Sequence, residues 1–507
     1  MDRRQFVLSS TATLVSSIAA AGRSEQGNTA TATEIAVDLH RDAGALPHYW
    51  ENTIGSDRLA VAFREPWLAD MTQSHELCGF RSVRCHGLFD DEMGICQGVT
   101  AAGPVTSFVY LDQIYDRLLA LGVKPFVELS FMPTALASSR NAIFWYRGNA
   151  SPPSNPADWS RLLEALTRHL IQRYGIAEVS QWRFECWNEP NLSFWAGTQA
   201  AYFELYRLTA TTLKRVDARL QVGGPATAEM MWIPEFLAYC RSRGAPIDFV
   251  STHVYADDPQ ENLFGRANRY PFEEVIPRAV AQANEQIRAA GFAGTPLVVS
   301  EWSSQNPAFI AQTLRDCLGL AETMSFWQVS SVFEEQGPPK SFATSQYGLF
   351  LQSGVPRASL HTFTLLHRLG DQRVWSGTGP LLASRRADGA TALIAWNLPP
   401  RTVRGSAGDP LAAFQSEVLG IGAAKILNIG LINARAQRAR LTVLDPAKTS
   451  AEAAYISLGK PEYPTREQIA ELKRLAALPA AEEVAISNSR VRIELPPNAI
   501  ALLELTA

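Results

Sequence analysis

The chain has 507 residues, 46% of them apolar, which is enough for more than one hydrophobic core and predicts two to three domains. Its 46 Lys and Arg against 50 Asp and Glu leave a net charge of -4, with the basic residues scattered. This balance argues against nucleic acid and against a membrane surface as partners. The six cysteines show no C-x-x-C pair and no zinc-like histidine spacing, so they are interpreted first as buried apolar residues, with a Cys85–Cys96 disulfide left open.

The N-terminal segment has the features of a processing signal. Arg3 and Arg4 precede a weakly apolar run, Val7 to Ala21, that is too short to span a bilayer stably. We interpret residues 1–25 as a twin-arginine-like export signal, which predicts a periplasmic or secreted protein. The alternative is a cytosolic leader with a chance arginine pair. Residues 26–33 would then form a disordered join.

Between residues 50 and 370, short apolar runs alternate with amphipathic stretches of helical periodicity. This alternation predicts an α/β fold, a (β/α)8 TIM barrel, in which the C-terminal ends of the strands form one catalytic face. The predicted helices include Tyr110 to Leu121, Pro156 to Tyr174, Ala201 to Val216 and Glu273 to Ala290. The eight predicted strand runs are Asn52 to Ser56, Ser82 to His86, Val123 to Phe131, Trp182 to Asn188, Leu220 to Pro225, Phe249 to Tyr255, Pro296 to Trp302 and Ser325 to Phe333.

After residue 370 the pattern changes to short runs with alternating polarity, which predicts an accessory C-terminal β-sandwich over residues 371–507. One helix is expected there, opened by Thr465 with Gln468 at the spacing of a capping box and running to Leu475. An N-terminal segment, residues 34–49, contains a strand that we expect to pair with this domain. The predicted strands are Thr391 to Leu398, Ala439 to Leu444, Val491 to Leu495 and Ile500 to Leu505.

Two glutamates lie at the ends of apolar runs in the predicted barrel. Glu189 occurs in Trp187-Asn188-Glu189-Pro190-Asn191, and Glu301 in Val299-Ser300-Glu301-Trp302. Because strand ends meet at one barrel face, we expect the two carboxyl groups to lie close together. Glycoside hydrolysis needs such a pair, one protonated and one ionised. Alone, Glu189 before Pro190 would be consistent with a charged residue that closes a strand.

Several further strings resemble glycoside hydrolase family 39, a family of β-xylosidases and α-L-iduronidases. The resemblance extends from about residue 34 to the C-terminus, and the order of the strings is more specific than any one of them. Ser331 departs from the pattern, where an aspartate is expected. Besides the two glutamate strings, the resemblance rests on Arg84-Cys85-His86-Gly87, Leu129-Ser130-Phe131-Met132-Pro133, His253-Val254-Tyr255, Val332-Phe333-Glu334-Glu335, Leu365-Leu366-His367-Arg368-Leu369-Gly370 and Pro464-Thr465-Arg466-Glu467-Gln468.

The resemblance implies a barrel with Glu189 as acid/base on strand four and Glu301 as nucleophile on strand seven. Asn188 would bind the sugar 2-hydroxyl, a contact that strengthens in the transition state. The other implied substrate-binding or pocket residues are His86, Phe131, His253, Tyr255, Trp302, Trp327, Glu334 and Glu335. For the histidines a structural role stays open, for the aromatic residues a place in the core, and for the last two glutamates a solvated surface.

The resulting hypothesis is a retaining, exo-acting β-xylosidase that releases xylose from short xylo-oligosaccharides. We expect a separation of about 5 to 5.5 Å between the two carboxyl groups. Neither a cofactor nor a metal is expected, because proton transfer and covalent catalysis suffice for this reaction. The alternatives are an α-L-iduronidase, another glycosidase of the family, or a catalytically silent sugar-binding protein.

Overall fold

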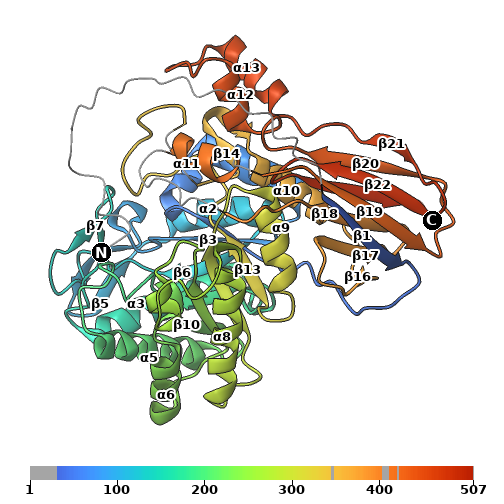
Figure 1. Cartoon of the computed structure of the whole chain (residues 1–507). Coiled ribbons are helices and arrows are strands. Elements are labelled where there is room, and N and C mark those ends of the chain that lie inside the picture. The colour runs from blue at the N-terminus through green and yellow to red at the C-terminus, as the bar shows by residue number, and fades with distance from the viewer. Residues whose placement is uncertain (1–30, 344–346, 402–409, 420–421, 506–507) are drawn as a thin grey trace.

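The computed structural model describes residues 31–343, 347–401, 410–419 and 422–505 (Figure 1). The predicted export signal and residues 26–30 of the predicted join lie outside these residues. The prediction of a disordered join was wrong for residues 31–33, which belong to the first strand, β1 (Thr31–Asp38). Within them, no helix is both long enough and apolar enough to cross a membrane.

Eight parallel strands close into a barrel. Each predicted run overlaps one strand, but the eighth strand begins at Thr323 and ends at Phe326, so most of the run Ser325 to Phe333 lies in a loop. The apolar residues Trp327, Val329 and Val332 of that loop are buried without being paired in a strand, which explains the wrong boundary. The strands are β2 (Ile54–Ser56), β3 (Ser82–Cys85), β6 (Lys124–Leu129), β9 (Arg183–Cys186), β10 (Gln221–Thr227), β11 (Phe249–His253), β12 (Leu297–Trp302) and β13 (Thr323–Phe326).

Helices follow the barrel strands and surround them (Figure 1). Several of these helices begin at a capping residue. The side chain of Asn155 caps α3 ahead of Pro156, and the side chain of Thr198 caps α5. The principal helices are α1 (Glu65–Cys78), α2 (Val109–Ala120), α3 (Pro156–Tyr174), α5 (Gln199–Val216), α6 (Ile233–Arg243), α8 (Val275–Ala289), α9 (Pro307–Asp316) and α10 (Ala358–His367). Shorter elements are α4 (Ile176–Val179), α7 (Gln260–Phe264) and the hairpins β4 (Cys96–Thr100) with β5 (Gly103–Thr106), β7 (Ala142–Ile143) with β8 (Gly148–Asn149), and β14 (Phe350–Leu351) with β15 (Val355–Pro356).

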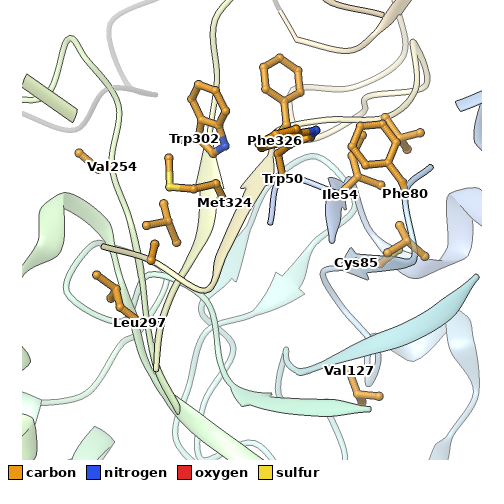
Figure 2. Close-up of a cluster of buried hydrophobic side chains, with 14 of the residues drawn as sticks. Trp50, Ile54, Phe80, Cys85, Val127, Val254, Leu297, Trp302, Met324 and Phe326 are labelled. Atoms are coloured by element: carbon orange, nitrogen blue, oxygen red, sulfur yellow. The ribbon is translucent and has the colours of Figure 1, made fainter. Parts of the chain in front are cut away.

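A large hydrophobic core joins the barrel strands to their helices. Figure 2 shows part of it, where Ile54, Met324 and Phe326 of neighbouring strands lie near Trp50 and Phe80. Phe326 contacts Phe363 of α10 with 5.0 Å between ring centroids. The last barrel helix is therefore anchored directly on the last barrel strand.

Two further sheets lie beside the barrel and pack on each other as a sandwich (Figure 1). In the smaller sheet the N-terminal strand β1 (Thr31–Asp38) pairs in parallel with a strand near the C-terminus, from Thr31 opposite Lys425 to Asp38 opposite Ile432. The smaller sheet has the order β1, β19 (Lys425–Ile432), β22 (Arg490–Leu495). The larger has the order β16 (Gln372–Arg373), β17 (Leu381–Arg385), β18 (Thr391–Trp396), β23 (Ile500–Leu505), β20 (Arg438–Leu444), β21 (Glu482–Ala485).

The central strands β18 and β23 of the larger sheet are buried on both faces. Along β23, Leu503 points into the core between the two sheets, whereas Leu502 points into the barrel core. In β18, Leu393 likewise points into the core between the two sheets and Ile394 into the barrel core. Because successive side chains of a strand face opposite sides, this double burial requires continuous apolar strands rather than alternating ones.

The expectation of one helix after residue 370 was wrong. Helix α13 (Arg466–Leu475) begins with the capping box of Thr465 and Gln468, but α11 (Pro410–Glu417) and α12 (Ala451–Ser457) accompany it. At seven residues, α12 is too short to show a helical period in the sequence. All six cysteines are buried and free, so the structure contains no Cys85–Cys96 disulfide.

Candidate active site

The two glutamates meet at the C-terminal face of the barrel. Glu189 follows β9, the fourth barrel strand, and Glu301 lies in β12, the seventh. A carboxyl oxygen of each and a ring nitrogen of His253 all lie within 4.8 Å of one another. Glu189 has a φ of 42° and Trp187 a φ of 70°, so the chain leaves β9 in a strained turn that aims the carboxyl group into the barrel. The Glu189 amide donates to Ala226 O of the next strand at 2.8 Å, which fixes this turn.

Two donors hold the Glu301 carboxylate in one orientation. The Tyr255 hydroxyl donates to Oε2 at 2.9 Å, and Arg84 Nη1 donates to Oε1 at 2.9 Å. Glu301 and Arg84 are completely buried, and Tyr255 is 8% exposed. Charge-assisted hydrogen bonds of this kind are about twice as strong as neutral ones, so the carboxylate is fixed before a substrate arrives.

Arg84 is the centre of a buried charge network. Its Nε donates to Glu185 Oε2 at 2.6 Å, and its Nη2 lies 2.8 Å from Glu128 Oε2 and 3.0 Å from Asn188 Oδ1. Burial alone would lower the pKa of Arg84, but the surrounding carboxylates outweigh it and raise that pKa above its ordinary value. Sequence reasoning did not include Glu128 and Glu185. Their signal was a glutamate inside each of two otherwise apolar strands.

The two predicted histidines have different partners. His253 Nδ1 is 3.0 Å from Glu189 Oε1 and 3.6 Å from Glu301 Oε2, so its ring lies against both catalytic candidates. His86 Nδ1 is 2.7 Å from Glu128 Oε2. Both rings are completely buried. The structure thus brings both into the site.

The predicted aromatic residues divide between the pocket and the core. The Trp327 ring is 4.7 Å from the His86 ring, and Phe131 is 6.3 Å from it. Trp302 instead packs edge-on against Phe326 at 5.5 Å, in the cluster of Figure 2. Because its ring contacts among the described residues do not include a site residue, we assign Trp302 to the core between strands and helices.

The two adjacent glutamates after β13, Glu334 and Glu335, have different partners. Glu334 pairs with Arg58 Nη1 at 2.9 Å and with Arg64 Nη2 at 2.8 Å. Glu335 Oε1 instead lies 3.6 Å from His86 Nε2, on the pocket side. Neither is solvated: their exposures are 1% and 3%.

Ser331 stands where an aspartate was expected, and the carboxylate beside it comes instead from Asp70 of helix α1. Asp70 of α1 accepts hydrogen bonds from the Ser330 hydroxyl at 2.7 Å and from the Ser331 amide at 3.2 Å. Burial raises the pKa of Asp70 to about 6 despite these donors. The loop that carries Glu334 and Glu335 is therefore tied to α1.

A hairpin turn that sequence reasoning missed lies beside His86. The turn between β7 and β8 brings Phe144 to 5.8 Å from Phe131 and 6.4 Å from the His86 ring. The Trp145 amide donates to Glu335 O at 2.7 Å, joining this turn to the loop after β13. The turn therefore adds an aromatic ring to the residues around His86.

Donor spacing alone would allow a cation at two places among the described residues. One is Glu189, His253 and Glu301, and the other is His48, Glu51 and His367. In the first group, Arg84 and Tyr255 already satisfy the Glu301 carboxylate. This arrangement fits acid/base and nucleophilic chemistry without a metal.

A closed parallel barrel with carboxyl groups from its fourth and seventh strands, buried within 4.8 Å of each other, defines a glycoside hydrolase of the barrel type. Comparison with known proteins agrees with this class. The chain belongs to glycosyl hydrolases family 39, whose profile matches residues 33–491.

Relatives cover most of the chain. A β-xylosidase of Caldicellulosiruptor saccharolyticus is 32% identical, over 91% of this chain and 96% of its own. A β-xylosidase of Geobacillus stearothermophilus is 37% identical, over 69% of this chain and 74% of its own. The crystal structure of a monomeric β-xylosidase from Caulobacter crescentus is 32% identical, with a TM-score of 0.83, and the match covers 93% of this chain and 99% of that one.

Proposed function

We propose that this protein is a retaining, exo-acting β-xylosidase that removes xylose from the non-reducing end of short xylo-oligosaccharides. The observation that carries the proposal is the pair of buried carboxyl groups of Glu189 and Glu301, in which one oxygen of each group lies within 4.8 Å of one oxygen of the other. Retaining glycosidases place the two groups about 5 to 5.5 Å apart, whereas inverting enzymes leave about 6.5 to 9.5 Å for a water. The short separation, and relatives that are β-xylosidases, support this assignment.

In the first step, Glu301 attacks the anomeric carbon while Glu189 gives its proton to the departing oxygen. The C–O bond to the aglycone breaks and a glycosyl ester on Glu301 forms. In the second step, Glu189 takes a proton from water, and the resulting hydroxide displaces Glu301 to release xylose. His253 contacts both carboxyl groups and holds them in position relative to each other through both steps.

Exo action is supported by the burial of the two carboxyl groups. Glu189 is 3% exposed and Glu301 is completely buried, and the Phe144 ring lies 6.4 Å from the neighbouring His86 ring. Asn188 accepts a hydrogen bond from Arg84, while its buried Nδ2 has no hydrogen-bond partner among the described residues. We assign that donor to the sugar 2-hydroxyl, next to the bond that is cleaved.

A neutral glycone fits the charges of the pocket better than a uronic acid. A substrate carboxylate would need a cation whose charge is not already balanced, but Arg84 is paired with Glu128, Glu185 and Glu301, and His86 with Glu128. Arg58, on the other side, is paired with Glu334. Xylose, which has no carboxylate, requires no such partner, so we favour it over an iduronide. Hydrolysis of an aryl iduronide but not of an aryl β-xyloside would reverse this choice.

Replacing the two glutamates tests their separate duties. Glu189→Ala should lose about 10²- to 10⁴-fold on xylobiose, which needs a proton on its leaving group. An activated aryl xyloside should still give a burst, followed by slow turnover that azide accelerates, because azide needs no base. Glu301→Ala should lose nearly all activity on both substrates. Equal losses on both substrates for Glu189→Ala, without azide rescue, would reject the acid/base assignment.

A further inference from the structure

His86 lies between a buried carboxylate and the pocket. Its Nδ1 is 2.7 Å from Glu128 Oε2, and its Nε2 is 3.7 Å from Glu301 Oε1 and 3.6 Å from Glu335 Oε1. Both distances from Nε2 are beyond hydrogen-bond range, and Nε2 has no hydrogen-bond partner among the described residues. A completely buried ring thus keeps one nitrogen unpaired, aimed between the nucleophile candidate and Glu335.

Glu128 is itself held firmly in place. It lies in β6, is 1% exposed, and accepts at Oε2 from Arg84 at 2.8 Å as well as from His86. Its other oxygen accepts from the Ser130 hydroxyl. With both oxygens engaged, Glu128 cannot turn toward the substrate, so any influence on the reaction must act through His86 or Arg84.

We propose that Glu128 is a positioning residue that keeps His86 as an imidazolium, so that Nε2–H donates a charge-assisted hydrogen bond to a glycone hydroxyl. This inference rests on the proposed function, because it assumes that a sugar fills the pocket. Without the substrate, Nε2 would face two carboxylates at a distance. With it, a hydroxyl can accept from Nε2 and donate to Glu335.

Charge balance supports the protonated ring. The carboxylates that face His86 are Glu128 from β6, Glu301 from β12 and Glu335 from the loop after β13. Arg84, two residues earlier in the chain, binds the same oxygen of Glu128. Burial would lower the pKa of His86, but the neighbouring carboxylates, Glu128 first among them, raise it to about 10. The ring therefore stays protonated across neutral pH. Its hydrogen bond to the substrate is then of the stronger, charge-assisted kind.

The test is the pH dependence of Glu128→Gln, a substitution that keeps the shape and removes the charge. Without the carboxylate, the pKa of His86 should fall below its wild-type value, since the largest contribution that opposes burial is gone. Relative to wild type, kcat/KM on an aryl xyloside should fall about 10- to 100-fold at pH 8, the effect of losing a hydrogen bond to a charged group. The deficit should narrow as the pH falls through the new pKa. A deficit that is the same from pH 5.5 to 8.5 would overturn the proposal.

Glu185→Gln is the matched control. Glu185 is equally buried and also contacts Arg84, but its other partner is the Ser300 hydroxyl at 2.8 Å rather than His86. This variant should lower activity by a factor that does not change with pH. If it acquires the same pH dependence as Glu128→Gln, the effect comes through Arg84 and the role assigned to Glu128 is wrong.

A readout that does not depend on turnover separates this inference from the proposed function. Histidine ring NMR, with the His86 signals assigned by their loss in His86→Gln, reports the protonation of His86 in the resting enzyme. Wild type should show a ring that stays protonated up to about pH 9, whereas in Glu128→Gln the ring should lose its proton at a lower pH. If the protein cleaves no xyloside, the proposed function fails while this titration still decides the protonation of His86. A neutral His86 at pH 7 in wild type would refute the inference alone.

Discussion

The cluster of His48, Glu51 and His367 makes a quantitative prediction about stability. Glu51 is 2% exposed and precedes the first barrel strand, while His367 ends the last barrel helix. Glu51 Oε1 is 2.6 Å from His48 Nδ1 and 3.0 Å from His367 Nδ1, and Arg81 Nη2 is 3.2 Å from Oε2. Glu51→Gln keeps the shape of this junction and removes its negative charge. The variant should therefore be less stable than wild type.

The size of the effect follows from burial. Arg81 is 57% and His367 41% exposed at the side chain, so solvent screens their contributions and we count neither. The buried hydrogen bond from His48 to a charged acceptor contributes about 1.5 to 3 kcal/mol. Unfolding entropy of about 2.1 cal/mol/K per residue gives roughly 1 kcal/mol/K for the whole chain. Cooperative unfolding should then begin about 1.5 to 3 °C lower in the variant.

The pH dependence has a definite sign. The hydrogen bond to Glu51 raises the pKa of His367 above 6.5, so its stabilisation is full below pH 6.5 and lost as pH rises through the raised value. Burial opposes ionisation of Glu51, but the two histidines outweigh it and lower its pKa below 4.5. That stabilisation is present above pH 4.5 and lost as pH falls through the lowered value. The loss of stability in Glu51→Gln relative to wild type should therefore be largest between pH 4.5 and pH 6.5, where both stabilisations are present.

Differential scanning calorimetry at pH 5.5 and at pH 8.5 measures this deficit. The matched control is Glu471→Gln, which removes the charge from the exposed pair between Glu471 and Arg474 on α13. Surface pairs contribute about 0 to 1 kcal/mol, so the control should shift Tm by less than about 1 °C. A Glu51→Gln deficit larger at pH 8.5 than at pH 5.5, or no larger than that of the control, would refute the reasoning.

Two further predictions concern the nucleophile and export. Tyr255→Phe removes the hydroxyl that donates to Glu301 at 2.9 Å, and the burst rate on an aryl xyloside should fall about 10- to 100-fold. An unchanged burst rate would mean that Arg84 alone suffices to hold the carboxylate. We also propose that the N-terminal signal directs export, so replacing Arg3 and Arg4 by Lys should leave precursor in the cytoplasm. Normal export of that variant would point to another route.

The sequence was sufficient to predict the barrel and to place Glu189 and Glu301 at the C-terminal ends of its strands, because both depend on local patterns. Apolar runs of strand length recur with helices between them, and Glu189 and Glu301 each lie at the end of such a run. The eighth strand was misplaced because Trp327 and Val332 are buried in a loop, and burial alone produces the same apolar signal.

The missed features depend on closure of the fold. Arg84 meets Glu128 and Glu185 only when β3, β6 and β9 lie side by side in the barrel, so their pairing has no local signal. Phe144 reaches the pocket from a hairpin outside the barrel pattern. For Trp302 the sequence left both a pocket wall and a place in the core open, because an aromatic residue suits either, and the choice needs its contact with Phe326. The position of a strand can be read from the local sequence, whereas the residues that a side chain contacts become known only from the three-dimensional structure.

Because β18 and β23 of the six-stranded sheet are buried on both faces, the barrel and the sandwich are not separable modules. Helix α9 packs against β18 and β23, and the barrel-facing side chains of these strands include Ile394, Trp396 and Leu502. A chain shortened after α10 would expose the apolar surface of α9 to water, which favours aggregation over an isolated barrel. An engineer who wants a smaller catalyst from this chain would first have to redesign that surface as a polar one.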